Sequence, residues 1–206
     1  MVIVMKIENA NRYYNDKGVA MKATDDRAHL SGVYRTFISK IEQVIERDRI
    51  ITDPLRTLAY GTDASFYRLI PQVVVKAENE EEVALLLRTA DSCNVSVTFR
   101  AAGTSLSGQA ISDSVLIVAG SHWQEREVLE EGGKIRLQPG VIGKHANSCL
   151  AGYNKKIGPD PASINAAMIG GIAANNASGM CCGTSQNSYK TVASMRIVFQ
   201  DGTILD

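Results

Sequence analysis

The stretch VVVKAENEEEVALLLRTADSCNVSVTFRAAGTSLSGQA spans residues 73–110 and is the most informative part of the chain about its fold. Its β-branched beginning, residues 73–77, is typical of a buried strand. Asn79 is a suitable helix N-cap, and the glutamates that follow it favour the positive end of a helix dipole. A second strand is expected at residues 95–99. The pattern therefore predicts a strand–helix–strand unit, which should cross over in the right-handed sense.

The loop after the second strand reads RAAGTSLSGQA, residues 100–110, and is built mostly of small residues that let a ligand approach the backbone. Successive N–H groups in such a turn form a concave nest for an anion, and the Thr and Ser hydroxyls add further donors. We expect a phosphate or pyrophosphate as the bound ligand. A surface turn of small residues is the alternative interpretation.

The residues that follow this loop exclude two familiar nucleotide-binding motifs. Gly103 and Gly108 are spaced as in a Walker A loop, but Gln109 and Ala110 stand where that motif needs Lys and Ser or Thr. A Rossmann fingerprint leads into a helix, whereas residues 111–119 lead into another predicted strand. An NTPase and a Rossmann dehydrogenase are therefore not expected.

A second group of small residues is GPDPASINAAMIGGIAANNASGMCCG, residues 158–183. Prolines stiffen its entry turn, and Gly170 with Gly171 removes side chains where something must come close. A neutral groove of this kind suits a flat or extended cofactor. Tight packing of a helix on a sheet is the alternative, because small residues also permit that. Two such loops in one chain favour a dinucleotide.

The remaining pattern predicts an α+β fold, with a small βαβ lobe followed by a mixed or antiparallel sheet lobe with helices. Residues 1–30 read as a leader or flexible arm. Residues 31–47 read as an amphipathic helix capped by Ser31, whose apolar stripe could pack on the following domain or on another part of the protein; Asp53 and Pro54 end it. The stripe consists of Val33, Phe37, Ile41, Val44 and Ile45. Further elements are a loop at 57–67, strands at 115–119, 135–138, 195–200 and 203–205, the last two joined by an Asp201–Gly202 turn, and helices near 143–150 and 165–174.

Composition narrows the class of protein further. The 206 residues, enough for one or two domains, carry 22 basic and 22 acidic side chains, so the net charge is zero and a nucleic-acid partner is not expected. The four cysteines lack CxxC spacing and the three histidines lack partners at ligand spacing, so neither a disulfide framework nor a metal site is expected. No run reaches the roughly 18 apolar residues of a membrane span. These features predict a cytoplasmic protein; association with the inner face of the membrane is the alternative.

Four ordered motifs carry a resemblance to a known family. The 100–110 loop, PGV at 139–141, PDPAS at 159–163 and IGGIAANNASG at 169–179 together resemble the FAD-binding domain of FAD-linked oxidases of the vanillyl-alcohol oxidase type. Within that group the chain looks most like the bacterial D-lactate and D-2-hydroxyglutarate dehydrogenases that are fused to an iron–sulfur domain.

The resemblance implies where the cofactor would bind. It covers residues 53–206, which follow the arm (1–30) and the helix with its linker (31–52). It implies that these residues form an FAD-binding domain whose subdomains, about 53–119 and 120–206, hold the pyrophosphate between them. The first loop would bind the pyrophosphate, the second motif would flank the cofactor, and the last two would line the ribityl and isoalloxazine side. The implied contacts are Ala101, Ala102, Gly103, Thr104, Ser105, Leu106, Ser107, Gly108, Gln109, Pro139, Gly140, Asp160, Pro161, Ala162, Ser163, Gly170, Gly171, Ala174, Asn175, Asn176, Ser178 and Gly179.

This chain departs from many relatives at Ala101, Ala102 and Ser105, where they have glycine. No histidine or cysteine matches a position of covalent flavin attachment, so dissociable FAD is expected. The resemblance also implies that the chain is a fragment without catalytic residues, that a 2-hydroxy acid passes a hydride to the flavin, and that a downstream acceptor takes the electrons. Any iron–sulfur clusters would lie in a missing C-terminal part. The alternatives are another FAD-linked enzyme, such as a glycolate oxidase subunit or an alkyl-glycerone-phosphate synthase-like transferase, and a non-catalytic flavin- or nucleotide-binding module.

Overall fold

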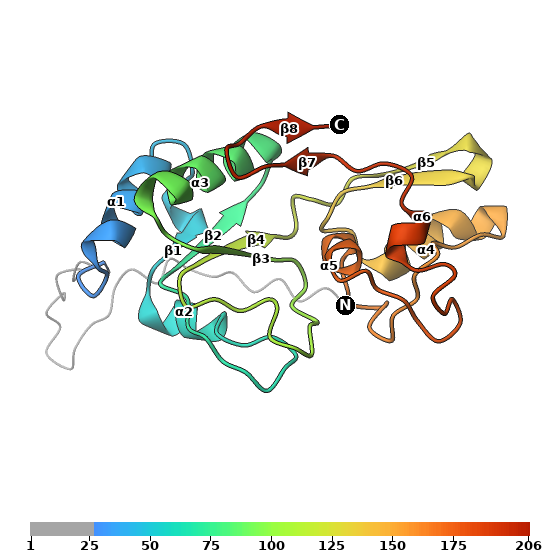
Figure 1. Ribbon diagram of the computed structural model, residues 1–206, viewed down its shortest axis with the longest axis horizontal. Helices are drawn as coiled ribbons and strands as arrows, with labels where there is room; N and C mark the ends of the chain where they lie inside the picture. Colours follow the sequence, from blue (N-terminus) through green and yellow to red (C-terminus); the bar gives the residue numbers. More distant parts are fainter. Residues whose placement is uncertain (1–26) are drawn as a thin grey trace, which may run out of the picture.

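The computed structural model describes residues 27–206, so most of the predicted arm at 1–30 lies outside the described residues. The described chain has two lobes that lie side by side along the long axis of the molecule (Figure 1). We call residues 27–119 the sheet lobe and residues 120–194 the second lobe. Residues 195–206 form a final hairpin.

The sheet lobe contains a four-stranded sheet in the order β1-β2-β4-β3. Its strands are β1 (Ile50–Ile51), β2 (Val73–Ala77), β3 (Val97–Arg100) and β4 (Val115–Ala119). The last three are parallel, and β1 is antiparallel to β2. Strands β2 and β4 confirm the predicted bounds, whereas β3 begins two residues later than expected. The predicted βαβ unit is present, but β4 lies between its two strands.

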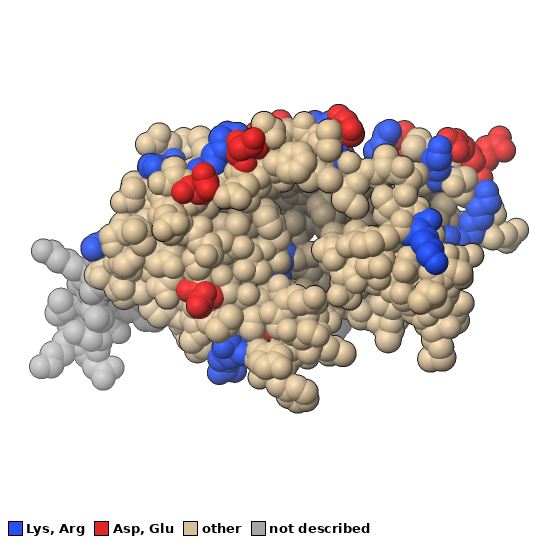
Figure 2. Space-filling model, in the orientation of Figure 1, with Lys and Arg blue, Asp and Glu red and all other residues tan. Residues whose placement is uncertain are grey.

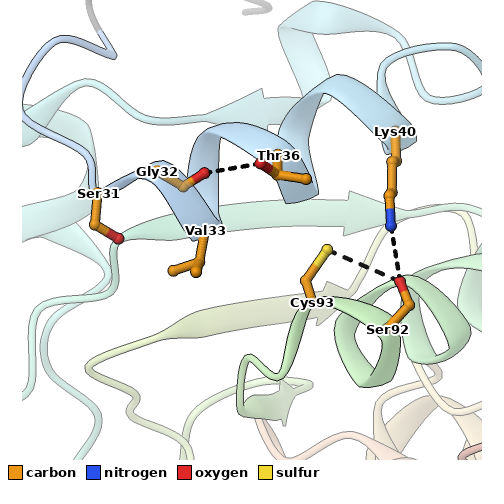
Figure 3. A pocket seen from close by; sticks show the side chains of 7 residues that line it. All are labelled: Ser31, Gly32, Val33, Thr36, Lys40, Ser92 and Cys93. Carbon is orange, nitrogen blue, oxygen red and sulfur yellow. Dashed lines mark hydrogen bonds between the residues drawn. The ribbon is translucent and has the colours of Figure 1, made fainter.

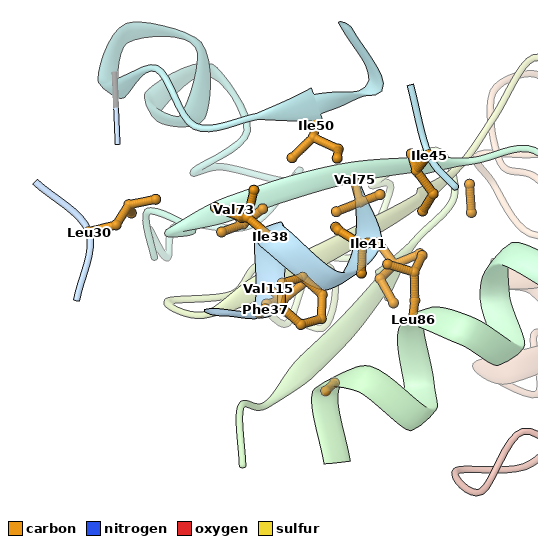
Figure 4. Packing of buried hydrophobic residues seen from close by; sticks show 13 residues of the cluster. Leu30, Phe37, Ile38, Ile41, Ile45, Ile50, Val73, Val75, Leu86 and Val115 are labelled. Atoms are coloured by element: carbon orange, nitrogen blue, oxygen red, sulfur yellow. The ribbon is translucent and has the colours of Figure 1, made fainter. Parts of the chain in front are cut away.

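Helix α3 (Glu80–Cys93) connects β2 to β3 and begins as predicted, because Asn79 Oδ1 accepts a hydrogen bond from the N–H of Glu82 at 2.9 Å. Asn94, in the left-handed region with φ of 53°, ends the helix. Together with α1 (Gly32–Ile41), α3 covers one face of the sheet, where Phe37 and Leu86 pack among the sheet valines (Figure 4).

Both faces of the sheet are covered, which explains why its strands are continuously apolar. Val73 and Val75 belong to the core under α1 and α3, whereas Val74 packs with Ile51 and Leu116 on the opposite face. All five side chains are almost fully buried, as expected for parallel strands that are covered on both sides.

The segment before β2 differs from its prediction in two ways. The helix expected over residues 31–47 ends at Ile41, and the exposed fractions of Val33 and Val44 are 50% and 60%, so these two valines do not belong to the packed stripe. Residues 54–59, expected as a helix break and loop, instead form α2 (Pro54–Ala59). Proline is favourable in a first helical turn, and the Asp53 carboxylate accepts the N–H of Arg56 at 2.9 Å.

The second lobe contains an antiparallel hairpin and three short helices. The hairpin pairs β5 (Arg126–Leu129) with β6 (Lys134–Leu137), and the helices are α4 (Gly143–Leu150), α5 (Ile169–Ala174) and α6 (Ser188–Thr191). Helix α4 confirms the prediction, and α5 begins four residues later than expected. Strand β5 was not predicted, because its two charged residues hide the strand pattern. Single 3₁₀ turns lie at Arg47–Arg49, Glu130–Gly132 and Ala151–Tyr153.

The final hairpin, β7 (Ile197–Val198) with β8 (Ile204–Leu205), confirms the predicted turn at Asp201–Gly202, although both strands are shorter than expected. The chain returns to the sheet lobe here and runs along α3 (Figure 1). Arg196 Nε lies 2.8 Å from the Glu80 carboxylate, which ties this return to the first turn of the helix.

Candidate functional site

A cavity of about 200 Å³ lies between the loop after β3 and the segment around α5, where the two lobes meet. Figure 2 shows a hollow between the lobes with a largely uncharged rim. The side chains around the cavity are apolar or carry only hydroxyl and amide groups. The lining residues are Phe99, Ala101, Ala102, Gly103, Thr104, Ser105, Gln109, Ala110, Pro161, Ser163, Ala167, Met168, Gly171, Ile172, Ala174, Asn175 and Ala177.

The loop at 101–110 is held in shape by two glycines and a serine. Gly103 and Gly108 have φ of 69° and 70°, a left-handed conformation that favours glycine. Ser105 Oγ accepts the N–H groups of Ser107 and Gln109 at 3.1 and 3.2 Å. The Ser105 side chain therefore stabilises the turn from its inner side.

The loop leaves a run of backbone donors free. The N–H groups of residues 102–106 donate to no acceptor among residues 27–206. The loop that carries this run is anchored at two points, because the Gly103 carbonyl accepts the N–H of Ala64 at 3.0 Å and Ala110 donates to the Asp63 carboxylate at 3.3 Å. Unpaired N–H groups in a loop with left-handed residues are the donors of an anion nest. We call residues 102–106 the cradle.

Asp63 is the ionised group that anchors the loop of the cradle at Ala110. Burial opposes its ionisation, but hydrogen bonds from Ser65 and Ala110 and the nearby charge of Arg100 together lower the pKa of this carboxyl group. It therefore remains a carboxylate at neutral pH and keeps accepting the N–H groups of Ser65 and Ala110.

The opposite wall of the cavity is formed by α5, whose two adjacent glycines have different roles. A Cβ on Gly170 would lie 2.9 Å from the Pro139 side chain, and the N–H of Gly170 donates to the Pro139 carbonyl at 2.8 Å. Gly170 is thus required for close packing. A Cβ on Gly171 would have no neighbour within 4 Å and Gly171 lines the cavity, so its missing side chain keeps space open.

Asp160 fastens the segment at residues 179–182 and does not line the cavity. Its carboxylate accepts the N–H of Cys182 at 3.2 Å and the Lys156 ammonium at 3.3 Å, and Gly179 packs directly against it. Partial burial opposes ionisation, but the hydrogen bonds from Cys182, Lys156 and Cys181 lower the pKa of Asp160 to about 2. Lys156 is therefore engaged by Asp160.

The structure brings together half of the implied cofactor contacts. Those that line the cavity are Ala101, Ala102, Gly103, Thr104, Ser105, Gln109, Pro161, Ser163, Gly171, Ala174 and Asn175. Those outside its lining are Leu106, Ser107, Gly108, Pro139, Gly140, Asp160, Ala162, Gly170, Asn176, Ser178 and Gly179. Asn176 Oδ1, for example, accepts the N–H of Tyr189 at 3.0 Å, and Gly140 packs against Trp123.

Sequence reasoning missed six lining residues: Phe99, Ala110, Ala167, Met168, Ile172 and Ala177. They lie within or directly beside the small-residue stretches at 100–110 and 158–183 and are apolar, so no chemical signal marks them. Helical spacing could have indicated Met168, which is the N-cap of α5 and lies three residues before Gly171.

A second hollow, of about 430 Å³, lies between α1 and the end of α3 (Figure 3). Lys40 Nζ donates to Ser92 Oγ at 3.0 Å there, and Ser92 also approaches the Cys93 sulfur at 3.9 Å. None of the implied cofactor contacts lines this hollow. Within residues 27–206, no cluster of three His, Cys, Asp or Glu side chains offers a metal site.

Solved structures with the same arrangement define the class of fold. An alkyldihydroxyacetonephosphate synthase superimposes with a TM-score of 0.72 at 21% identity, covering 84% of this chain and 35% of that one. A p-cresol methylhydroxylase superimposes with a TM-score of 0.70 at 13% identity, covering 85% and 35%. The chain therefore has the α+β fold of vanillyl-alcohol oxidase type flavoproteins, as predicted.

The chain belongs to the family described as FAD binding domain, which matches residues 71–206. The D-2-hydroxyglutarate dehydrogenase of Escherichia coli K12 is 29% identical over 174 residues, which are 82% of this chain and 17% of the relative. The glycolate oxidase subunit GlcD of the same organism is 36% identical over 120 residues, 57% of this chain and 24% of the relative. The chain thus spans only about a fifth of the length of these relatives.

Proposed function

We propose that the chain binds FAD between its two lobes, with the pyrophosphate on the cradle. The observation that carries this proposal is the run of free N–H groups at residues 102–106, because residues 102–105 line a cavity without ionisable side chains. Backbone N–H groups neutralise phosphate charge without a cluster of lysines. Membership of the FAD binding domain family supports FAD as the guest.

The cavity fits part of this cofactor. Its volume of about 200 Å³ is below the roughly 300–1,000 Å³ of sites that enclose a drug-sized ligand. We assign the cradle to the pyrophosphate and the α5 wall, including Gly171, to the adjoining part of the cofactor. The free N–H groups of the cradle and the open surface at Gly171 would bind and orient the cofactor.

We further propose that the chain is the FAD-binding part of a flavin-dependent dehydrogenase that oxidises a D-2-hydroxy acid, either D-lactate or D-2-hydroxyglutarate. Several relatives are named as D-2-hydroxyglutarate or D-lactate dehydrogenases. When bound, FAD supplies a hydride acceptor for the oxidation of the hydroxyl-bearing carbon. The cavity side chains position the cofactor, and we place the groups that hold the substrate carboxylate outside this cavity. No helix among the described residues is long and apolar enough to cross a membrane.

A glycolate oxidase subunit is a second candidate, because GlcD is 36% identical to this chain within the matched region. Glycolate is also a 2-hydroxy acid, so both candidates require the same hydride transfer. They differ in the side chain that the substrate site must accept.

The test is a titration of the purified chain with FAD, followed by quenching of flavin fluorescence and by visible absorbance. Saturable uptake of non-covalent FAD, released on denaturation, is expected. A folded sample that takes up no FAD from excess would contradict the cofactor assignment. Anaerobic bleaching of the bound flavin by D-2-hydroxyglutarate, D-lactate or glycolate would identify the substrate, and bleaching by none would leave FAD binding without this activity.

A further inference from the structure

Arg100 is the last residue of β3 and lies two positions before the cradle. Different nitrogen atoms of its guanidinium contact two different parts of the chain. On one side, Nη1 donates to the carbonyl groups of Tyr60 and Thr62 at 3.1 and 2.8 Å. These carbonyls belong to the segment that follows α2. Arg100 therefore ties the end of β3 to the segment after α2.

The other side of the same guanidinium lies against the cradle. A Cβ on Gly103 would be 2.6 Å from Arg100 Nη2 and 2.7 Å from Nε, so the glycine backbone rests on the guanidinium. Within residues 27–206, Nε and Nη2 donate to no acceptor. Two charged donors thus remain available beside a glycine that lines the cavity.

The charge of Arg100 matters because an anion already stands nearby. The Asp63 carboxylate anchors the loop of the cradle at Ala110, and it would repel a pyrophosphate bound to the same loop. An arginine keeps its positive charge at all physiological pH values. Its position beneath Gly103 offsets the charge of Asp63 where the phosphates would bind.

We propose that Arg100 is a positioning residue for the pyrophosphate, which holds the cradle in shape and supplies positive charge beneath it. This inference rests on the proposed FAD site. It assigns one cation to a site whose lining residues are neutral. A purely structural clamp is the competing explanation, since the bonds to Tyr60 and Thr62 would also hold the loop.

Salt dependence distinguishes these explanations, because added salt screens a charge effect but leaves the shape of the loop unchanged. The dissociation constant for FAD is measured by fluorescence quenching at low and high NaCl for the wild type, Arg100→Met and Arg100→Lys. The melting temperature of each protein is measured alongside. The matched control is Arg136→Met, which removes an exposed arginine paired with Glu127 on the β5–β6 hairpin.

For Arg100→Met we expect the dissociation constant to rise about tenfold at low salt, with a smaller ratio to the wild type at about 1 M salt. Arg100→Lys keeps the charge and the salt dependence, and it loses only part of the affinity. Arg136→Met leaves the dissociation constant unchanged. If Arg100→Met does not fold, the lysine variant carries the test, because a loss of its salt dependence would contradict the charge role.

The outcomes also separate this inference from the proposed function. A ratio that stays constant with salt leaves only the structural clamp, and unchanged affinity in both Arg100 variants removes both roles. Either result overturns this proposal while FAD binding stands. If the folded wild type takes up no FAD at either salt concentration, the proposed function fails, and the role of Arg100 fails with it.

Discussion

Replacing Gly171 by leucine tests the geometry of the cavity most directly. Gly171 lies within α5, its added Cβ would meet nothing within 4 Å, and it lines the cavity opposite the cradle. The Cβ of a leucine there has open space around it, and the rest of the side chain projects into the cavity of about 200 Å³. The change therefore blocks the proposed cofactor site and leaves the packing of the helix intact.

The expected magnitudes follow from these contacts. Glycine costs about 0.8–1 kcal/mol in a helix interior relative to alanine, and leucine is close to alanine, so the free energy of unfolding should stay the same or rise slightly. The dissociation constant for FAD should rise at least about tenfold, which corresponds to about 1.4 kcal/mol. Urea denaturation measures the first quantity, and titration followed by flavin fluorescence measures the second.

The matched control is Gly152→Leu. Gly152 lies in the 3₁₀ turn after α4, also has no neighbour within 4 Å of an added Cβ, and does not line the cavity. It should leave FAD affinity unchanged. Undiminished affinity in a folded Gly171→Leu protein would refute the placement of the cofactor beside α5. Gly103→Val is a poorer test, because its side chain would also collide with Arg100.

Three further predictions concern the framework of the site. Glu82→Gln should cost about 3 kcal/mol in a urea denaturation, because it breaks a buried ion pair with Arg49 at 2.7 and 2.8 Å; a loss below about 0.5 kcal/mol would contradict this role. The pKa of Asp160 is lowered to about 2, so its stabilising effect is complete above its ordinary pKa of about 3.9 and is lost as the pH falls through 2. Melting temperatures of Asp160→Asn should therefore depend less on pH between about 4 and 2 than those of the wild type, and parallel pH profiles would argue against this. Asn79→Ala should reduce the free energy of unfolding by about 1 kcal/mol through loss of the α3 cap, with Asn79→Asp as the variant expected to retain it.

Local patterns in the sequence were sufficient for much of the secondary structure. The β-branched runs at 73–77 and 115–119, the cap at Asn79 and the Asp201–Gly202 turn each depend on residues adjacent in the chain. Sequence patterns gave a wrong prediction where adjacent residues allow two interpretations. Asp53 and Pro54 looked like the end of one helix but begin another, because proline suits the first turn of a helix as well as the residue after one.

The candidate site shows the same division between local and distant information. Small residues at 100–110 and 158–183 indicated two ligand-accessible loops, and four ordered motifs indicated a flavin-binding fold, since both signals are written in consecutive residues. Only the tertiary structure shows that β4 separates β2 from β3, that Gly170 packs on Pro139 while Gly171 faces the cavity, and that Arg100 lies beneath Gly103. The physical reason is that these properties depend on which distant atoms surround a residue. Composition and spacing specify what a loop can bind, whereas long-range packing decides which of its residues face the space where binding occurs.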